Sequence, residues 1–425
     1  MAYLFALLYL ACIYLRPAEI VPGWEDFPFA VVSATVAGLA VVGSLVLRPR
    51  RFWHLPQDRF VLVFLAAVAA SNAAWGWFSG ALDGTLAMAP AAFCYFLLRS
   101  AIESPAQLRG VTYVLVGLTL FQAVNGIVQF HTGSGIGGVV ALEDHSLLTD
   151  GDEEDEVRRI RGTGIFNDPN DLAMTLVIAV PFVAGPLFRR GIPRRVLALA
   201  MLALVPIVTA LYYTNSRGGM LGLAAAVLPY GYRRFGRLAG TVAGAAGLVL
   251  LIALGPSRMA GLDASESSAQ GRIQAWAEGL QMFKSQPLFG VGFGRYTDFN
   301  RLVAHNSFVH TLGELGLLGT FAFVGMGYWF FLSSRRCQLT GAEGWREDLW
   351  QSGLALAICA MFLSRQYSVV LFVWLALSAG YLHLMAATPQ RSPRPAVHLA
   401  RIAAITAGGV ICAYVAVRLF GQFSV

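Results

Sequence analysis

The residues best suited to chemistry stand at the head of a long apolar run. His305, Asn306 and Ser307 lie where the run 306–332 begins. A run of this length is typical of a transmembrane helix, and polar groups are costly in lipid unless something uses them. A neutral imidazole can take up a proton near pH 7. We therefore predict that His305 lies where a membrane helix meets water. There it would act on a lipid-borne substrate with a polar head.

Two further polar residues follow in the same run. His310 and Glu314 are four residues apart, which places them on one helix face, and we interpret them as a polar pair near the interface. The sequence contains no Gly-x-Ser-x-Gly, His-Glu-x-x-His or Cys-x-x-Cys motif. Its five cysteines show no spacing typical of a disulfide framework or a metal site. We therefore expect neither a metal nor a cofactor.

Three arginines at predicted outer membrane boundaries form the second group. Arg217 lies in a turn between two apolar runs, Arg272 lies in the first turns of a predicted helix, and Arg161 lies in a loop. Arginine on the outer side opposes the positive-inside bias, so its presence there suggests a specific role. The planar guanidinium suits phosphate oxygens and stays charged near lipid. The alternatives are snorkelling to the interface or a structural ion pair.

The composition predicts a membrane protein. Of the 425 residues, 56% are hydrophobic and only 13% are charged, and the mean hydropathy is +0.61. A soluble domain carries roughly 25% charged residues. The net charge of +7 arises mainly from arginines in short loops between apolar runs, which indicates membrane orientation and argues against a nucleic-acid partner. We therefore expect an all-α polytopic protein that forms a single integral membrane domain, 1–425.

The apolar runs set the number of crossings. Several of them are shorter than the roughly 20 residues that a span needs, so we expect 12 or 13 transmembrane helices. Arginine clusters recur in alternate loops along the whole chain and place the N-terminus inside. The runs are 2–15, 29–47, 60–78, 85–98, 111–130, 171–188, 196–213, 218–230, 238–254, 306–332, 349–363, 367–386 and 402–420.

Two long segments fall on the predicted outer side. The loop 131–170 contains an acidic run, 150–156, which we interpret as solvated; a divalent-ion site is the weaker alternative. The larger segment, 255–305, is predicted to hold a helix over 270–284 that ends before Pro287. The glycine-rich turn 287–294 follows and lacks the Lys-Ser/Thr of a nucleotide-binding loop.

These motifs, taken in order, resemble those of the O-antigen ligase and polymerase superfamily of bacterial envelope enzymes. The resemblance covers residues 161–319, and the hydropathy pattern extends it to nearly the whole chain. One departure is Asp168, where the family more often has nothing acidic before proline. The matching motifs are His305-Asn306 followed after nine residues by Gly316-Leu317-Leu318-Gly319, Ser216-Arg217-Gly218, Arg272-x-x-x-Trp276 with Pro287-Leu288-x-Gly290-x-Gly292, and Asn167-Asp168-Pro169-Asn170 opening a helix.

The resemblance implies a class C-like glycosyltransferase in the bacterial inner membrane with its active site facing the periplasm. Such enzymes move a glycan from undecaprenyl diphosphate to a hydroxyl of a glycan, lipid A core or protein acceptor, with inversion and without metal. Carried over, His305 is the general base, and Arg272 and Arg217 hold the diphosphate. The remaining motif residues are expected to bind substrate: Arg161, Asn170, Trp276 and Asn306.

Other functions fit parts of the pattern. A polymerase would extend lipid-linked repeat units instead of attaching glycan to another acceptor, and the histidine motif favours the ligase only slightly. A transporter or flippase would place ionisable residues at mid-membrane, where this chain has almost none. A structural membrane scaffold would tolerate replacement of the predicted catalytic residues. The motifs therefore favour the enzyme.

Overall fold

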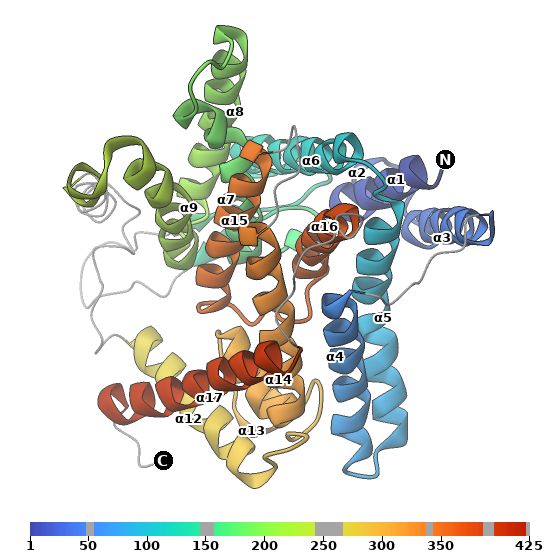
Figure 1. Cartoon of the computed structure of the whole chain (residues 1–425), viewed down its shortest axis with the longest axis vertical. Helices are drawn as coiled ribbons and strands as arrows, with labels where there is room; N and C mark the ends of the chain where they lie inside the picture. The colour runs from blue at the N-terminus through green and yellow to red at the C-terminus, as the bar shows by residue number, and fades with distance from the viewer. Residues whose placement is uncertain (48–54, 145–156, 243–266, 337–342, 386–394, 422–425) are drawn as a thin grey trace. The chain divides into compact units, whose positions relative to one another are not determined.

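The computed structural model describes the chain except for residues 48–54, 145–156, 243–266, 337–342, 386–394 and 422–425 (Figure 1). Its described part is almost entirely helical, with one small antiparallel pair of strands, β1 (Leu142–Asp144) and β2 (Val157–Arg159). The helices in chain order are α1 (Ala2–Leu15), α2 (Pro17–Ile20), α3 (Phe29–Leu47), α4 (Pro56–Ala73), α5 (Phe78–Ala101), α6 (Pro105–Thr132), the 3₁₀ turn η1 (Gly164–Phe166), α7 (Pro169–Phe188), α8 (Arg194–Tyr213), α9 (Arg217–Phe235), α12 (Ser267–Ser285), α13 (Tyr296–Phe299), α14 (Ser307–Arg336), α15 (Glu343–Ala360), α16 (Val369–Met385) and α17 (Pro395–Phe420).

Seven of the described helices are long and apolar enough to cross a membrane: α3, α5, α6, α7, α8, α14 and α17. Helices α1 and α16 are apolar but shorter. This confirms the predicted all-α polytopic membrane fold. Three other apolar runs form α4, α9 and α15, and most of the run 238–254 lies outside the described residues. The figure of 12 or 13 crossings therefore stays a prediction.

By its internal contacts the chain forms two compact units, each assembled from three separate stretches. Unit 1 comprises Met1–Arg48, Ser104–Gly261 and Thr340–Cys359. Unit 2 comprises Pro49–Glu103, Leu262–Leu339 and Ala360–Val425.

Unit 1 is built around α7, which packs against α6, α8 and α9. Most of the α7 side chains are buried, as expected of a helix that is apolar on all sides. The Asp168 carboxylate begins this helix by accepting the backbone N–H groups of Asn170 (2.8 Å) and Asp171 (3.4 Å), and Pro169 occupies the first helical position. The acidic residue that departs from the family pattern thus acts as a helix cap.

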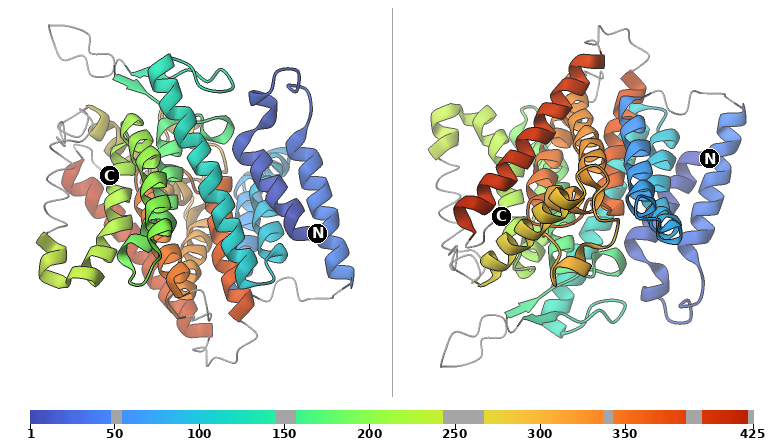
Figure 2. Two further views of the ribbon diagram at one scale, coloured as in Figure 1. Left: turned by 90° about the horizontal axis from the view of Figure 1, so that it is seen from above. Right: turned by 90° about the horizontal axis from the view of Figure 1, so that it is seen from below.

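Unit 2 is built around α14, which packs against α4, α12, α16 and α17 (Figure 2). Helices α4 and α5 form a hairpin held by a buried ion pair, with Arg99 Nη2 2.9 Å from Asp58 Oδ2. Tyr95 donates its hydroxyl hydrogen bond to the same carboxylate (2.8 Å). The predicted helix over 270–284 is confirmed as α12, which ends at Ser285 before Pro287.

Candidate active site

Helix α12 is tied to the residue that precedes the predicted catalytic histidine. The indole N–H of Trp276 donates to the carbonyl of Ala304 over 2.9 Å. Arg272 lies one turn earlier on α12 and is partly exposed. Buried side chains from α12 and α14, among them Leu280 and Leu312, form a common apolar core. The packing therefore brings the Arg272 turn of α12 to the segment that carries His305.

His305 has an unusual backbone conformation. Its φ is +47°, in the left-handed region, and its side chain is partly exposed just before α14 begins. A residue other than glycine rarely adopts this conformation, and such strain is frequent at functional sites. Next along the chain, Asn306 Oδ1 caps α14 by accepting the N–H groups of Phe308 (3.0 Å) and Val309 (3.1 Å). The side-chain oxygen of Asn306 is therefore engaged in the cap. Its predicted role in substrate binding stays a prediction.

Ser307 joins the head of α14 to the turn between α15 and α16. Its hydroxyl donates to the carbonyl of Leu363 (2.6 Å) and accepts the N–H of Arg365 (3.0 Å). The turn 361–368 therefore lies beside His305. Arg365 was not among our predicted residues, although one signal could have found it: it is an arginine between two apolar runs on the predicted outer side.

A break in α14 receives the glycine-rich turn 287–294. Gly316 interrupts the helix with φ 59° and ψ −156°, a conformation that favours glycine. The turn pairs with this break through its backbone: Val291 N–H donates to Gly313 O (3.0 Å), and Leu317 N–H donates to Pro287 O (2.8 Å). Gly316 of the histidine motif thus allows two backbone segments to approach closely.

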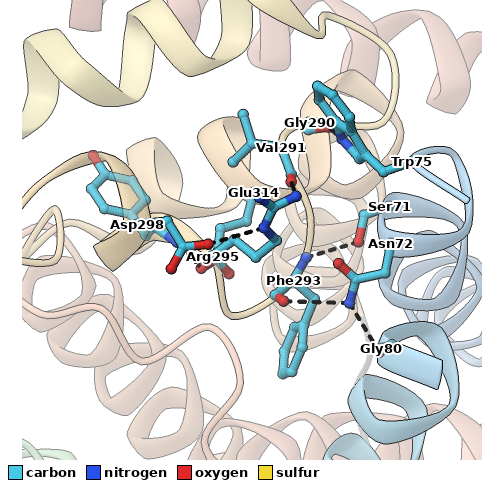
Figure 3. Close-up of polar contacts among 11 residues, drawn as sticks. Ser71, Asn72, Trp75, Gly80, Gly290, Val291, Phe293, Arg295, Asp298 and Glu314 are labelled. Carbon is cyan, nitrogen blue, oxygen red and sulfur yellow. Dashed lines mark hydrogen bonds and ion pairs between the residues drawn. The ribbon is translucent and has the colours of Figure 1, made fainter. Parts of the chain in front are cut away.

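The other side of the same turn is held by α4 (Figure 3). Ser71 Oγ accepts the N–H of Phe293 over 3.0 Å, and Asn72 Nδ2 donates to the carbonyl of Phe293 over 3.4 Å. Trp75, which follows the end of α4, donates from Nε1 to the carbonyl of Gly290 over 3.2 Å. The turn that follows α12 is therefore clasped between α4 and α14. No local pattern in the sequence predicts that the end of α4 contacts the turn 287–294.

Glu314 is the buried carboxylate of this region. It accepts hydrogen bonds from the backbone N–H of Tyr296 (3.0 Å) and the hydroxyl of Tyr367 (2.9 Å). His310 Nε2 lies 3.1 Å from it, which confirms the predicted polar pair. Burial, together with the charge of Glu314, raises the pKa of Tyr296, so the tyrosine stays protonated and donates to the carbonyl of Ala275. Glu314 thus links α13, α14 and the turn 361–368.

In unit 1 the structure brings two predicted motifs together. Asn170 Oδ1 accepts the hydroxyl hydrogen of Ser216 over 2.8 Å. Ser216 Oγ also accepts the N–H of Gly219 (3.2 Å), so it caps α9 and leaves Arg217 as the first residue of that helix. The Arg217 side chain is partly exposed. Asn170 therefore holds the turn that presents Arg217.

A second arginine supports this turn. Arg159 is buried, and it donates from Nε to the carbonyl of Thr214 (3.0 Å) and from Nη2 to Asn170 Oδ1 (3.3 Å). No motif or spacing in the sequence distinguishes Arg159 from its neighbours. Arg161, which we did predict, donates from Nε to the carbonyl of Val140 over 2.7 Å, and its N–H donates to Gln129 Oε1 over 2.9 Å. Part of the Arg161 side chain therefore holds the segment near β1.

The predicted site residues thus form two groups. His305, Asn306, Trp276 and Arg272 belong to unit 2, and Arg217, Asn170 and Arg161 belong to unit 1. Among the described residues, no group of His, Cys, Asp or Glu side chains could hold a metal ion. The acidic run 150–156 lies almost wholly outside the described part of the chain.

Comparison with known proteins defines the class of the protein. The family model for the O-antigen ligase matches residues 202–324, from α8 to α14, and so includes Arg217, Arg272, Trp276 and His305. No curated protein matches the chain. The protein is a multi-pass membrane protein, and its residues 202–324 match the O-antigen ligase family, as the motifs predicted. Its function is of the O-antigen ligase or polymerase type, with a lipid-linked glycan and an acceptor as substrates.

Proposed function

We propose that the protein transfers a glycan from undecaprenyl diphosphate to an acceptor hydroxyl on the periplasmic side of the bacterial inner membrane. One observation carries this proposal: the Trp276–Ala304 hydrogen bond and the α12–α14 core fix the Arg272 turn beside the partly exposed His305. A base can activate the acceptor hydroxyl, and a guanidinium can neutralise the departing diphosphate, so the two groups suit glycan transfer.

In the proposed reaction, His305 removes the proton from the acceptor hydroxyl as its oxygen attacks the anomeric carbon of the donor sugar. The bond from that carbon to the diphosphate oxygen breaks, and the configuration inverts. Negative charge develops on the departing diphosphate, where Arg272 supplies fixed donors and positive charge. No metal ion is needed in this scheme, because guanidinium groups neutralise the leaving group.

Arg217 is proposed to bind donor phosphate as well. It is the first residue of α9, and a helix N-terminus favours an anion through its free N–H groups. Asn170 contributes by holding Ser216 in the same turn. Trp276, Asn306 and Arg161 are proposed to shape the substrate site from its edges, since each has polar atoms engaged in holding a neighbouring segment.

The decisive variant is His305→Ala in the full-length protein. We expect transfer from a lipid-linked donor to be lost while the protein stays folded in the membrane, because no other base replaces the imidazole. His131→Ala, which alters a histidine of unit 1, serves as the matched control and should retain activity. Wild-type transfer by His305→Ala would contradict the proposal.

A product assay separates the ligase from the polymerase. The purified protein is given lipid-linked repeat units without any other acceptor, and the products are sized. Long glycans on lipid would establish the polymerase, whereas products formed only after lipid A core or protein is added would establish the ligase. Glycan–lipid movement that survives His305→Ala, in a protein without transfer activity, would instead identify a transporter.

A further inference from the structure

Arg365 lies in the turn 361–368 of unit 2, which leads from α15 into α16. No motif of the sequence covers this part of the chain. The turn is on the predicted outer side, where the positive-inside bias disfavours arginine. The side chain is partly exposed, and its guanidinium is charged at every physiological pH.

The backbone of Arg365 is fixed on both sides. Its N–H donates to Ser307 Oγ (3.0 Å), and its carbonyl accepts the N–H (3.1 Å) and the hydroxyl hydrogen (2.9 Å) of Ser368. The same Ser307 hydroxyl donates to the carbonyl of Leu363, so the first half of the turn is bonded at two points to the head of α14. A side chain that starts from such a fixed point loses less entropy when it binds a ligand.

This fixed point is close to the proposed base. Ser307 is two residues after His305, and two residues of extended chain span at most about 7 Å. The long side chain of Arg365 starts one hydrogen bond from Ser307. In the same turn, Tyr367 donates to the buried Glu314, which anchors the far end of the turn to α14.

We infer that Arg365 binds phosphate oxygens of the lipid-linked donor beside His305, as a further guanidinium in addition to Arg272. The inference rests on the proposed function. A diphosphate carries more charge than one guanidinium neutralises, and a planar fork can bind two oxygens at once. The turn 361–368 thereby supplies substrate contacts from a part of the chain that lies outside the matched family segment.

Binding of undecaprenyl diphosphate to the full-length protein in nanodiscs tests the inference directly. The variants are Arg365→Ala and Arg365→Lys, and Arg301→Ala is the matched control because Arg301 is an exposed arginine of the same unit. We expect Arg365→Ala to weaken diphosphate binding by about tenfold or more, which is the usual scale for one charged hydrogen-bonding group. Arg365→Lys should recover only part of the affinity, and Arg301→Ala should bind within about twofold of the wild type.

Binding of undecaprenol, which has the same tail without phosphate, distinguishes recognition from damage. Loss of diphosphate binding with undecaprenol binding unchanged supports the inference. Unchanged diphosphate binding, or equal loss for both lipids in folded Arg365→Lys protein, overturns it. His305→Ala separates this question from the proposed function: it should keep diphosphate affinity and lose transfer. A wild-type protein that binds diphosphate through Arg365 but transfers no glycan would refute the proposed function alone.

Discussion

At the scale of single residues, the candidate site depends on how His305 is held. The residue before it receives the Trp276 hydrogen bond, and the residue after it caps α14. Two flanking constraints over-determine the backbone, which is the condition under which a left-handed non-glycine residue persists. The strain is thereby balanced by contacts that lie outside the His305 side chain.

Trp276→Phe tests this support. The change keeps the aromatic ring but removes the indole N–H, so the buried Ala304 carbonyl loses its partner at a cost of about 1–3 kcal/mol. We expect transfer to fall by about tenfold through a lower kcat, because a displaced base loses its reactive geometry. Steady-state kinetics and thermal unfolding measure both effects. Trp24→Phe, at an exposed tryptophan, is the control, and equal kcat values for the two variants would show that the contact does not position His305.

At the scale of elements, the break in helix α14 at Gly316 is what lets the turn 287–294 bond to this helix. The apolar run 306–332 predicts one uninterrupted helix, and the sequence contains no proline there to indicate a break. The break at Gly316 becomes intelligible only with its partner, the turn 287–294, whose N–H groups bond to α14 carbonyls. Local patterns could therefore predict the bounds of α12 and the position of the glycine-rich turn, but not which segments they meet.

Gly316→Ala should be strongly destabilising. Its φ of +59° disfavours any side chain, and a Cβ atom would lie 2.6 Å from the Leu288 carbonyl carbon. We expect a loss of about 2 kcal/mol or more in the free energy of unfolding, with loss of transfer. Gly327→Ala lies in the same helix with open space around its Cβ position and should be neutral or slightly stabilising. Similar unfolding temperatures for the two variants would contradict the role of the break.

The α4–α5 hairpin offers a second test at this scale. Asp58→Asn would leave the buried guanidinium of Arg99 without its charge partner, which typically costs about 3–5 kcal/mol. Because α4 also clasps the turn 287–294, we expect transfer to fall together with stability. Asp83→Asn changes an exposed carboxylate on α5 and should leave both unchanged. Denaturation in mild detergent measures the difference, and full stability of Asp58→Asn would refute the ion pair's contribution.

At the scale of the whole molecule, residues far apart in sequence form each unit. The matched family segment, 202–324, contributes to both units, and each unit is completed by stretches outside it. This explains why the contacts of Arg365 and Arg159 escaped prediction: Ser307 and Thr214 are distant from them in sequence, and motif spacing carries no information about such contacts. The motif residues themselves were predictable, because their types and order repeat a known pattern.

The orientation of the protein in the membrane can be tested on the two ends of α14, in unit 2. Ser307, at the head of α14, bonds to the turn 361–368, whereas Arg335 lies at the other end of the same helix. Arg335 belongs to an arginine cluster that marks a predicted inner loop, so the opposite end of α14 is predicted to lie outside. We therefore expect Arg301→Cys to react with an impermeant maleimide from the periplasm. Arg194→Cys, in a predicted inner loop, should react only after the membrane is opened. The labelling is measured in a background without the native cysteines, and the reverse pattern would place His305 in the cytoplasm and exclude a periplasmic transfer site.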